Sequence, residues 1–109
     1  MVVSLKKNYE FRRLYTRGKS AGNSLLVMYQ RRNGSQTNRL GITVGGKVGG
    51  AVVRNRVRRR IREIYRLGEG RLKRGYDIVI VARVRAKDAS YDELERALWG
   101  LARRMELLA

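Results

Sequence analysis

Three segments of the chain carry apolar residues at the spacing of an amphipathic helix. The first is expected over Asn8–Arg17, where Asn8 can cap the helix and Gly18 can end it. The second is expected over residues 51–67 and is followed by a glycine-rich turn. The third is expected over residues 90–107, because it opens with a Ser-x-x-Glu capping box and then repeats leucine every three or four positions.

Between these helices, three runs have the composition of strands: Ser24–Gln30, Arg39–Val44 and Tyr76–Val84. The last run is almost continuously apolar, which is typical of a fully buried strand. In the first run both alternating sets of side chains are apolar, so one set is available to cover a binding surface rather than the core. Residues 31–38 are polar and contain an Asn-Gly turn signal. The pattern predicts an α/β fold with a small sheet, in a single domain over residues 1–109.

The central helix has an unusual distribution of charge. Seven arginines lie between Arg54 and Arg66, against one acid, Glu63. Its apolar face is made by Val53, Val57, Ile61 and Ile64. The polar side chains on the opposite arc are Arg54, Asn55, Arg58, Arg59, Arg62 and Arg66. A solvated helix usually mixes its charges, so this one-sided cationic helix predicts contact with a polyanion.

The composition strengthens that expectation. The chain has 26 lysines and arginines against 9 acids, for a net charge of +17. Such an excess opposes compaction by self-repulsion and favours nucleic acid as the partner, ahead of a membrane surface. Only four of the basic residues but five of the acids lie in residues 87–109, so the cationic character belongs to the earlier part of the chain and the last segment is expected to be structural.

A protein-borne active site is not expected. The chain has no histidine and no cysteine, and its carboxylates are few and dispersed. The usual general bases, nucleophiles and metal ligands are therefore missing. There is also no apolar run of 18 residues and no signal-peptide core after the first lysines, which predicts a cytoplasmic protein with no membrane-spanning segment.

Two further features admit both a structural and a functional interpretation. The glycines around Lys47 do not match a P-loop and favour a tight turn into the next helix, although a helix N-terminus can receive a phosphate. Phe11 and Tyr15 lie one helical turn apart, and Tyr29 lies on the first strand. Aromatic residues mostly pack in cores, but they can also stack on unpaired bases.

The chain resembles the protein subunit of bacterial ribonuclease P over nearly its whole length. The signature of that family is a lysine, a glycine, Ala-Val, Arg-Asn-Arg and a basic helix that closes on Ile-Arg-Glu. The corresponding residues here are Lys47, Gly49, Ala51-Val52, Arg54-Asn55-Arg56, Arg58-Arg59 and Ile61-Arg62-Glu63. Similar segments outside the helix are Glu10-Phe11, Gly18-Lys19-Ser20, Arg39-Leu40-Gly41 and Asp77–Arg83.

The resemblance implies a protein that binds one catalytic RNA and, with it, removes the 5′ leader from precursor tRNA. The RNA carries the cleavage chemistry through bound Mg²⁺, and the protein alone binds no metal. On this basis the residues that bind the RNA subunit are Lys47, Arg54, Asn55, Arg56, Arg58, Arg59, Arg62 and Arg66. The residues that line a cleft for the single-stranded leader are Phe11, Tyr15, Val27 and Tyr29.

The resemblance also implies the fold, an αβββαβα sandwich with a small mixed sheet. Its basic helix makes a left-handed crossover between two parallel strands, against the usual handedness rule. An additional short strand is implied near Lys19–Gly22. This chain departs from the family at Gly45-Gly46, where Ser-Lys is usual, and at Arg60, where Leu is usual. Arg60 falls beside the apolar face and must extend to its edge or meet an acid.

Two other classes of protein share part of this pattern. A general RNA-binding protein, such as a small ribosomal protein, would also be basic and lack catalytic groups, but it has no reason to combine the Arg-Asn-Arg helix with the aromatic cleft. A membrane-surface binder would need bulky apolar side chains exposed beside its cations. The apolar face of the basic helix is instead expected to pack in the core.

Overall fold

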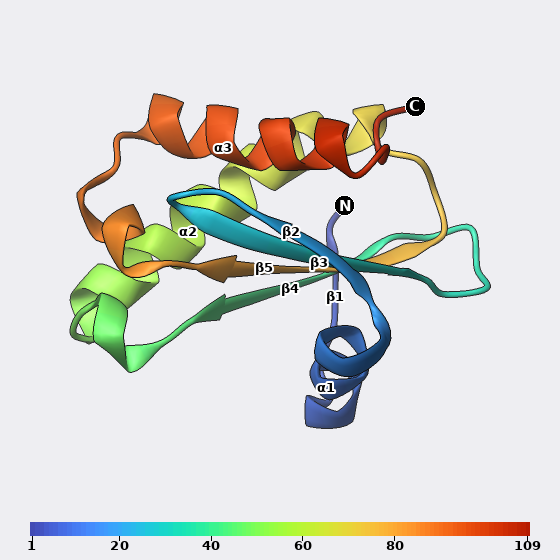
Figure 1. The fold of residues 1–109 in the computed structure, drawn as a ribbon, viewed down its shortest axis with the longest axis horizontal. Coiled ribbons are helices and arrows are strands. Elements are labelled where there is room, and N and C mark those ends of the chain that lie inside the picture. Colours follow the sequence, from blue (N-terminus) through green and yellow to red (C-terminus); the bar gives the residue numbers. More distant parts are fainter.

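The computed structural model describes residues 1–109, which form a five-stranded sheet and three α-helices (Figure 1). The strands are β1 (Val3–Ser4), β2 (Lys19–Gly22), β3 (Leu26–Arg32), β4 (Arg39–Val44) and β5 (Tyr76–Ala82). The helices are α1 (Asn8–Arg17), α2 (Ala51–Gly68) and α3 (Tyr91–Arg104). Short 3-10 turns occupy Gly46–Val48, Glu69–Arg71 and Val84–Asp88.

The order of strands across the sheet is β1-β4-β5-β3-β2. β4 runs parallel to β5 and to β1, whereas β3 is antiparallel to both β5 and β2. The basic helix α2 connects the parallel strands β4 and β5. The expected α/β architecture and its short strand at Lys19–Gly22 are therefore confirmed, and β1 is an addition that the sequence pattern did not predict.

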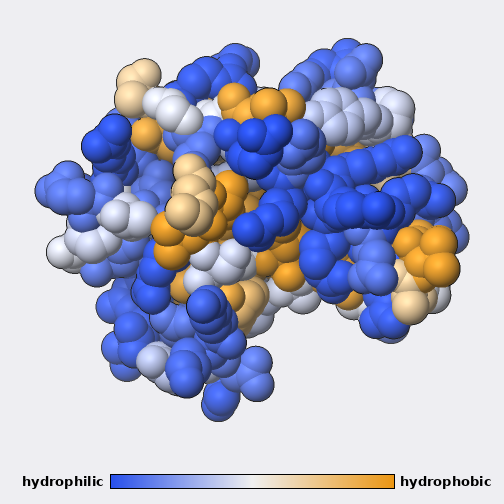
Figure 2. All heavy atoms as spheres, turned by 180° about the vertical axis from the view of Figure 1, so that it is seen from behind, coloured by the Kyte–Doolittle hydropathy of each residue, from blue (hydrophilic) through white to orange (hydrophobic).

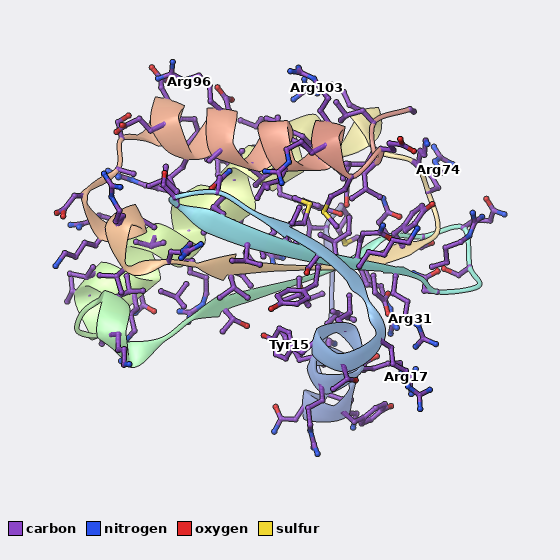
Figure 3. The ribbon with its side chains drawn as sticks, viewed as in Figure 1. Tyr15, Arg17, Arg31, Arg74, Arg96 and Arg103 are labelled. Atoms are coloured by element: carbon purple, nitrogen blue, oxygen red, sulfur yellow. The ribbon has the colours of Figure 1, made fainter.

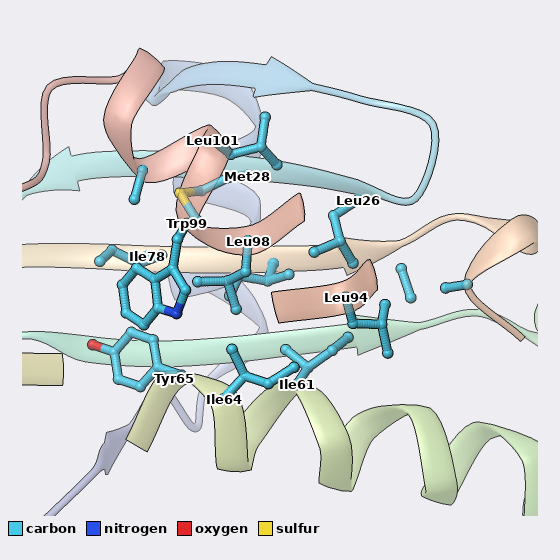
Figure 4. Packing of buried hydrophobic residues seen from close by; sticks show 14 of the residues in the cluster. Leu26, Met28, Ile61, Ile64, Tyr65, Ile78, Leu94, Leu98, Trp99 and Leu101 are labelled. Carbon is cyan, nitrogen blue, oxygen red and sulfur yellow. The ribbon is translucent and has the colours of Figure 1, made fainter. Parts of the chain in front are cut away.

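Helices α2 and α3 cover one face of the sheet and enclose the main core (Figures 1 and 4). β3 and β5 direct alternate side chains such as Met28 and Ile80 into it, and α2 contributes Ile61. The indole of Trp99 on α3 packs against the backbone of Gly68, where a Cβ atom would lie only 2.2 Å from the ring. The core thus uses the apolar face that the helical spacing of α2 predicts.

The opposite face of the sheet is covered by α1 alone (Figure 1). A smaller cluster of Leu5, Leu14 and Val79 lies under this helix, with Phe11 and Tyr29 packed partly buried against it. A ten-residue helix cannot cover five strands, so part of this face remains open beside α1. That open face is where the family resemblance implies a cleft.

Several element boundaries differ from the expected ones. The strand expected at Ser24–Gln30 is β3 at Leu26–Arg32, because the Asn23 side chain accepts hydrogen bonds from the backbone N–H groups of Leu25 and Leu26 and holds the preceding residues in a turn. Lys7, not Asn8, holds the N-cap position of α1, because the Glu10 carboxylate accepts hydrogen bonds from the backbone N–H groups that precede the helix. β5 ends at Ala82 instead of Val84, since the chain enters a 3-10 turn there. Helix α3 ends at Arg104 instead of Leu107. The last residues then run beside the segment that connects α2 to β5, where the Lys73 N–H donates to the Leu107 carbonyl.

Candidate nucleic-acid interface

The outer face of α2 carries one continuous cationic strip. Helical spacing brings Asn55, Arg58, Arg59 and Arg62 together with Val52 along a shallow depression, and we call these five residues the arginine stripe. Val52 is 80% exposed even though it is apolar. No carboxylate lies in the stripe, so its three guanidinium groups present uncompensated positive charge to the solvent.

Two of the three arginines in the stripe are hydrogen-bonded to neutral partners. The Arg58 Nη1 atom donates to the Asn55 Oδ1 atom at 3.0 Å, and the Arg62 Nη1 atom donates to the Ser4 hydroxyl at 3.2 Å. These contacts orient the side chains without neutralising them. The guanidinium of Arg59 forms no ion pair within the protein and is exposed.

Arg66, predicted to belong to the same arc, is in a different electrostatic state. It makes a two-pronged ion pair with Glu63 one turn earlier, with N–O distances of 2.8 and 2.9 Å. The hydrogen bond from Arg66 lowers the pKa of the Glu63 carboxyl. Both side chains are exposed, so water screens this pair, but the carboxylate still offsets part of the positive charge at this end of α2.

Two other arginines of α2 point away from the stripe. The Arg56 Nη2 atom reaches the Lys87 carbonyl at 3.5 Å, and the Arg60 Nη1 atom reaches the Ala89 carbonyl at 3.3 Å. Arg60 therefore extends to the edge of the apolar face and meets a backbone carbonyl rather than an acid. The Nε atom of Arg54 is buried without a hydrogen-bond partner. Arg56, which the resemblance includes among the RNA-binding residues, therefore lies apart from the stripe, and Arg60 is not part of the predicted arc.

Lys47 lies outside the helix, in the 3-10 turn that precedes α2, and its side chain is exposed. The glycines around it form the tight turn that the sequence favoured, since the backbone N–H of Val48 donates to the Gly45 carbonyl at 3.1 Å. Gly50 then holds the N-cap position of α2 with no side-chain cap. There is no acidic residue in the first turn of the helix. The positive end of the α2 dipole therefore adds to the cationic character of this region.

A second depression, which we call the groove, runs between α1 and the edge of the sheet. Its apolar wall on the helix is formed by Phe11 and Tyr15. The remaining lining residues are Asn8, Arg12, Ile42, Thr43, Val44 and Arg58. Figure 2 shows a central apolar band bordered by hydrophilic side chains on the back of the molecule. Arg58 belongs to both depressions, so the groove and the arginine stripe are continuous at this side chain.

The structure brings the four predicted cleft residues to the same face of the sheet, but it gives them different surroundings. Tyr15 is 38% exposed, and its ring meets that of Tyr29 edge-to-face with centroids 5.0 Å apart. Val27 is half-buried two residues from Tyr29 on the same side of β3. The wall of the groove opposite α1 comes from β4 rather than β3. Tyr15 and its position on α1 below the sheet are seen in Figure 3.

The contribution of β4 to the groove is not predicted by the sequence pattern or by the family resemblance. The available signal was the alternation in β4, where Leu40, Ile42 and Val44 are the apolar set. That alternation turns Thr43 toward the opposite face of the sheet, where α1 lies. It does not reveal which helix covers that face, because this depends on contacts between segments that are distant in the chain.

The carboxylates of the protein do not gather anywhere into a group of three or more that could hold a metal ion. Glu10 and Asp77 are both engaged by Arg39. The backbone N–H of Lys7, followed by that of Lys6 and then by the charge of Arg39, lowers the pKa of the Glu10 carboxyl. None of the helices combines the length and the apolar character needed to cross a bilayer.

Comparison with known proteins places this geometry in a family. The family model described as Ribonuclease P matches residues 2–106. The chain is 48% identical over 105 residues to the "Ribonuclease P protein component" of Alkaliphilus metalliredigens, covering 96% of this chain and 95% of the relative. It is 50% identical to the protein of the same name from Clostridium novyi, covering 94% of this chain and 93% of the relative.

Solved structures have the same fold. The RNase P protein of Staphylococcus aureus superimposes with a TM-score of 0.91 at 32% identity, covering all of both chains. The RNase P protein of Thermotoga maritima superimposes with a TM-score of 0.85 at 32% identity, covering 93% of this chain and 96% of the other.

Proposed function

This chain belongs to the ribonuclease P protein family, and we propose that it binds the catalytic RNA subunit through α2 and the 5′ leader of precursor tRNA through the groove. It is the protein component of a ribonucleoprotein endonuclease, so its partner in the enzyme is an RNA. The observation that carries the proposal is the arginine stripe, whose three arginines lack any acidic partner and adjoin an aromatic groove through Arg58. An uncompensated cationic helix suits a phosphate backbone.

The groove suits a single strand better than a duplex. Its Phe11 and Tyr15 rings offer apolar surface, while Arg12 and Arg58 supply positive charge at its borders. Base–aromatic stacking contributes roughly 1–3 kcal/mol per base and tolerates any sequence. Such tolerance suits a protein that meets leaders of different sequence.

The chemistry of the side chains indicates which steps belong to the protein and which to the RNA subunit. Cleavage of a phosphodiester needs a nucleophile, a general base or bound metal, and we assign these to the RNA subunit and the Mg²⁺ that it binds. The protein supplies affinity and orientation for the leader. Purified protein freed of RNA is therefore expected to leave precursor tRNA uncut in the presence of Mg²⁺; specific 5′ cleavage by the protein alone would contradict this assignment.

The groove is tested with Phe11→Ala and Tyr15→Ala in the reconstituted holoenzyme. Each variant is expected to weaken the binding of precursor tRNA and to leave the affinity for mature tRNA, which has no leader, unchanged. The matched control is Tyr9→Ala, because Tyr9 is a 55% exposed aromatic on the same helix that lies under Arg13 and outside the groove.

Thermal unfolding of the variants separates binding from folding. If Phe11 and Tyr15 served only the core, their loss would lower the melting temperature and weaken every interaction together. Equal losses of affinity for precursor and mature tRNA would contradict the proposal that the leader binds in the groove. Arg58→Ala is expected to affect both the RNA subunit and the leader, since Arg58 lines both depressions.

The identity of the RNA partner is tested by recovering the RNA that copurifies with the tagged protein. One abundant structured RNA is expected. Recovery of bulk ribosomal RNA would instead support a general RNA-binding protein.

A further inference from the structure

One face of β4 makes three contacts with α1 at alternate positions along the strand. The contacts join Arg39 to Glu10, Gly41 to Phe11, and Thr43 to Tyr15. Two of these helix residues form the aromatic wall of the groove. The contacts therefore determine where that wall stands relative to the sheet.

The first contact is an ion-pair network. The Arg39 Nη1 atom lies 2.6 Å from the Glu10 carboxylate, while its Nε and Nη2 atoms both donate to Asp77 at 2.8 Å. Asp77 is the residue paired with Arg39 across the parallel strands β4 and β5. Glu10 also accepts hydrogen bonds from the backbone N–H groups of Lys6 and Lys7. Arg39 thus ties the start of α1 to two central strands with the geometry of a bidentate guanidinium–carboxylate pair.

The second contact is steric. A Cβ atom on Gly41 would lie 2.5 Å from the Cε2 atom of Phe11 and 2.7 Å from its Cζ atom. These distances are far below van der Waals separation, so the ring lies directly on the strand backbone. Any larger residue at position 41 therefore requires the Phe11 ring, and the groove wall that it forms, to shift.

The third contact is a hydrogen bond within the groove. The hydroxyls of Tyr15 and Thr43 lie 2.8 Å apart. The Tyr15 hydroxyl is thereby occupied, and its ring is fixed between Tyr29 and the groove. The tyrosine consequently offers its ring rather than its hydroxyl to a bound base.

We propose that Arg39, Gly41 and Thr43 are positioning residues that set the width of the groove and thereby the preference of the holoenzyme for precursor over mature tRNA. The inference rests on the proposed binding of the leader in the groove. Arg39 does not line the groove, so it affects the leader only through the placement of α1. Gly41 and Thr43 act through the two aromatic side chains.

The first test uses Arg39→Lys, which keeps the charge but loses the two-pronged bond, and Gly41→Ala, which displaces Phe11. Both variants are expected to lower the ratio of precursor to mature tRNA affinity by about fivefold or more, equivalent to one lost base stack. RNA-subunit affinity is expected to stay unchanged and serves as the measure of correct folding. Binding is measured well below each variant's melting temperature, so a purely structural role would not change the ratio.

The second test isolates the hydroxyl pair. Thr43→Ser keeps the hydrogen bond and is expected to preserve the ratio, whereas Thr43→Val and Tyr15→Phe each remove it and are expected to lower the ratio. If Thr43 acts through Tyr15, combining Thr43→Val with Tyr15→Phe lowers the ratio no further than either single substitution does. Additive losses would mean that Thr43 touches the leader directly and would overturn its positioning role.

Different results would overturn the positioning role and the binding of the leader in the groove. Suppose that Phe11→Ala lowers the ratio of precursor to mature tRNA affinity, whereas Arg39→Lys and Gly41→Ala leave it unchanged. That result would overturn the positioning proposal but would still support binding of the leader in the groove. An unchanged ratio in Phe11→Ala as well would remove the leader assignment on which the positioning proposal depends.

Discussion

Removing one arginine from the arginine stripe should change the salt dependence of RNA binding by a predictable amount. Arg59→Ala is the cleanest perturbation, because Arg59 is exposed and forms no ion pair within the protein. The substitution exchanges one helix-forming residue for another on the surface of α2, so the fold should be unaffected. In the proposed interface, the substitution removes one cation that faces the phosphate backbone.

The size of the effect follows from counterion release. Each neutralised phosphate of a duplex contributes about 0.9 to the slope of log affinity against log salt concentration. Arg59→Ala should therefore lower the magnitude of that slope by about 0.9. Between about 50 and about 200 mM salt, the advantage of the unmodified protein over the variant should shrink about 3.5-fold. Asn55→Ala should leave the slope nearly unchanged, since Asn55 carries no charge.

The assay is binding of the purified RNA subunit over a series of salt concentrations. Arg96→Ala is a matched control, because Arg96 projects from the outer side of α3, away from the stripe (Figure 3). Glu63→Gln should act in the opposite direction, since it releases Arg66 from its ion pair and frees a cation for the RNA. If Arg59→Ala and Arg96→Ala give the same slope as the unmodified protein, the stripe does not face the phosphate backbone.

Three further predictions concern stability. Gly68→Ala should destabilise the protein by about 1–3 kcal/mol in thermal unfolding, because the new Cβ would overlap the ring of Trp99; an unchanged melting temperature would show that the ring can move. Ser90→Ala should cost about 1 kcal/mol in urea unfolding, since the Ser90 hydroxyl caps α3; no loss would mean that solvent replaces the cap. The Glu10 pKa is lowered in the folded state by the Lys7 N–H, so its contribution to stability is present at neutral pH and is lost as the pH falls below the ordinary value near 4.5. Glu10→Gln should weaken the pH dependence of the urea midpoint in that acidic range, and an unaltered profile would contradict the assignment.

Periodicity was sufficient to predict the main elements of the fold. The spacing of Val57, Ile61 and Ile64 places one face of α2 in the core, and the structure buries all three. β1 could not be predicted in this way, because a two-residue strand has no period to detect. It exists through pairing with Arg39 and Leu40 of β4, which is information that no local pattern contains.

The candidate interface was predictable only in part, for a similar reason. A helical wheel correctly groups Asn55, Arg59 and Arg62 on the exposed side of α2. It cannot show that Arg56 reaches the Lys87 carbonyl, because that partner lies 31 residues away. The contacts of long flexible side chains depend on which distant segments the tertiary fold brings near them. The arginines of α2 therefore have different partners, although they share one helix.

The two edge strands of the sheet affect whether copies of this protein associate with one another. Unpaired strand edges are templates for association between chains, and short or charged edges suppress it. One edge here is β4, of which the two-residue strand β1 covers only Arg39 and Leu40. The other edge is β2, which begins at the exposed Lys19 and whose Gly22 carbonyl is occupied by Arg104. In the free protein the net charge of +17 also keeps copies apart. A bound RNA cancels much of that repulsion, and the short, partly blocked edges then remain as the protection against strand-to-strand polymerisation in the crowded ribonucleoprotein.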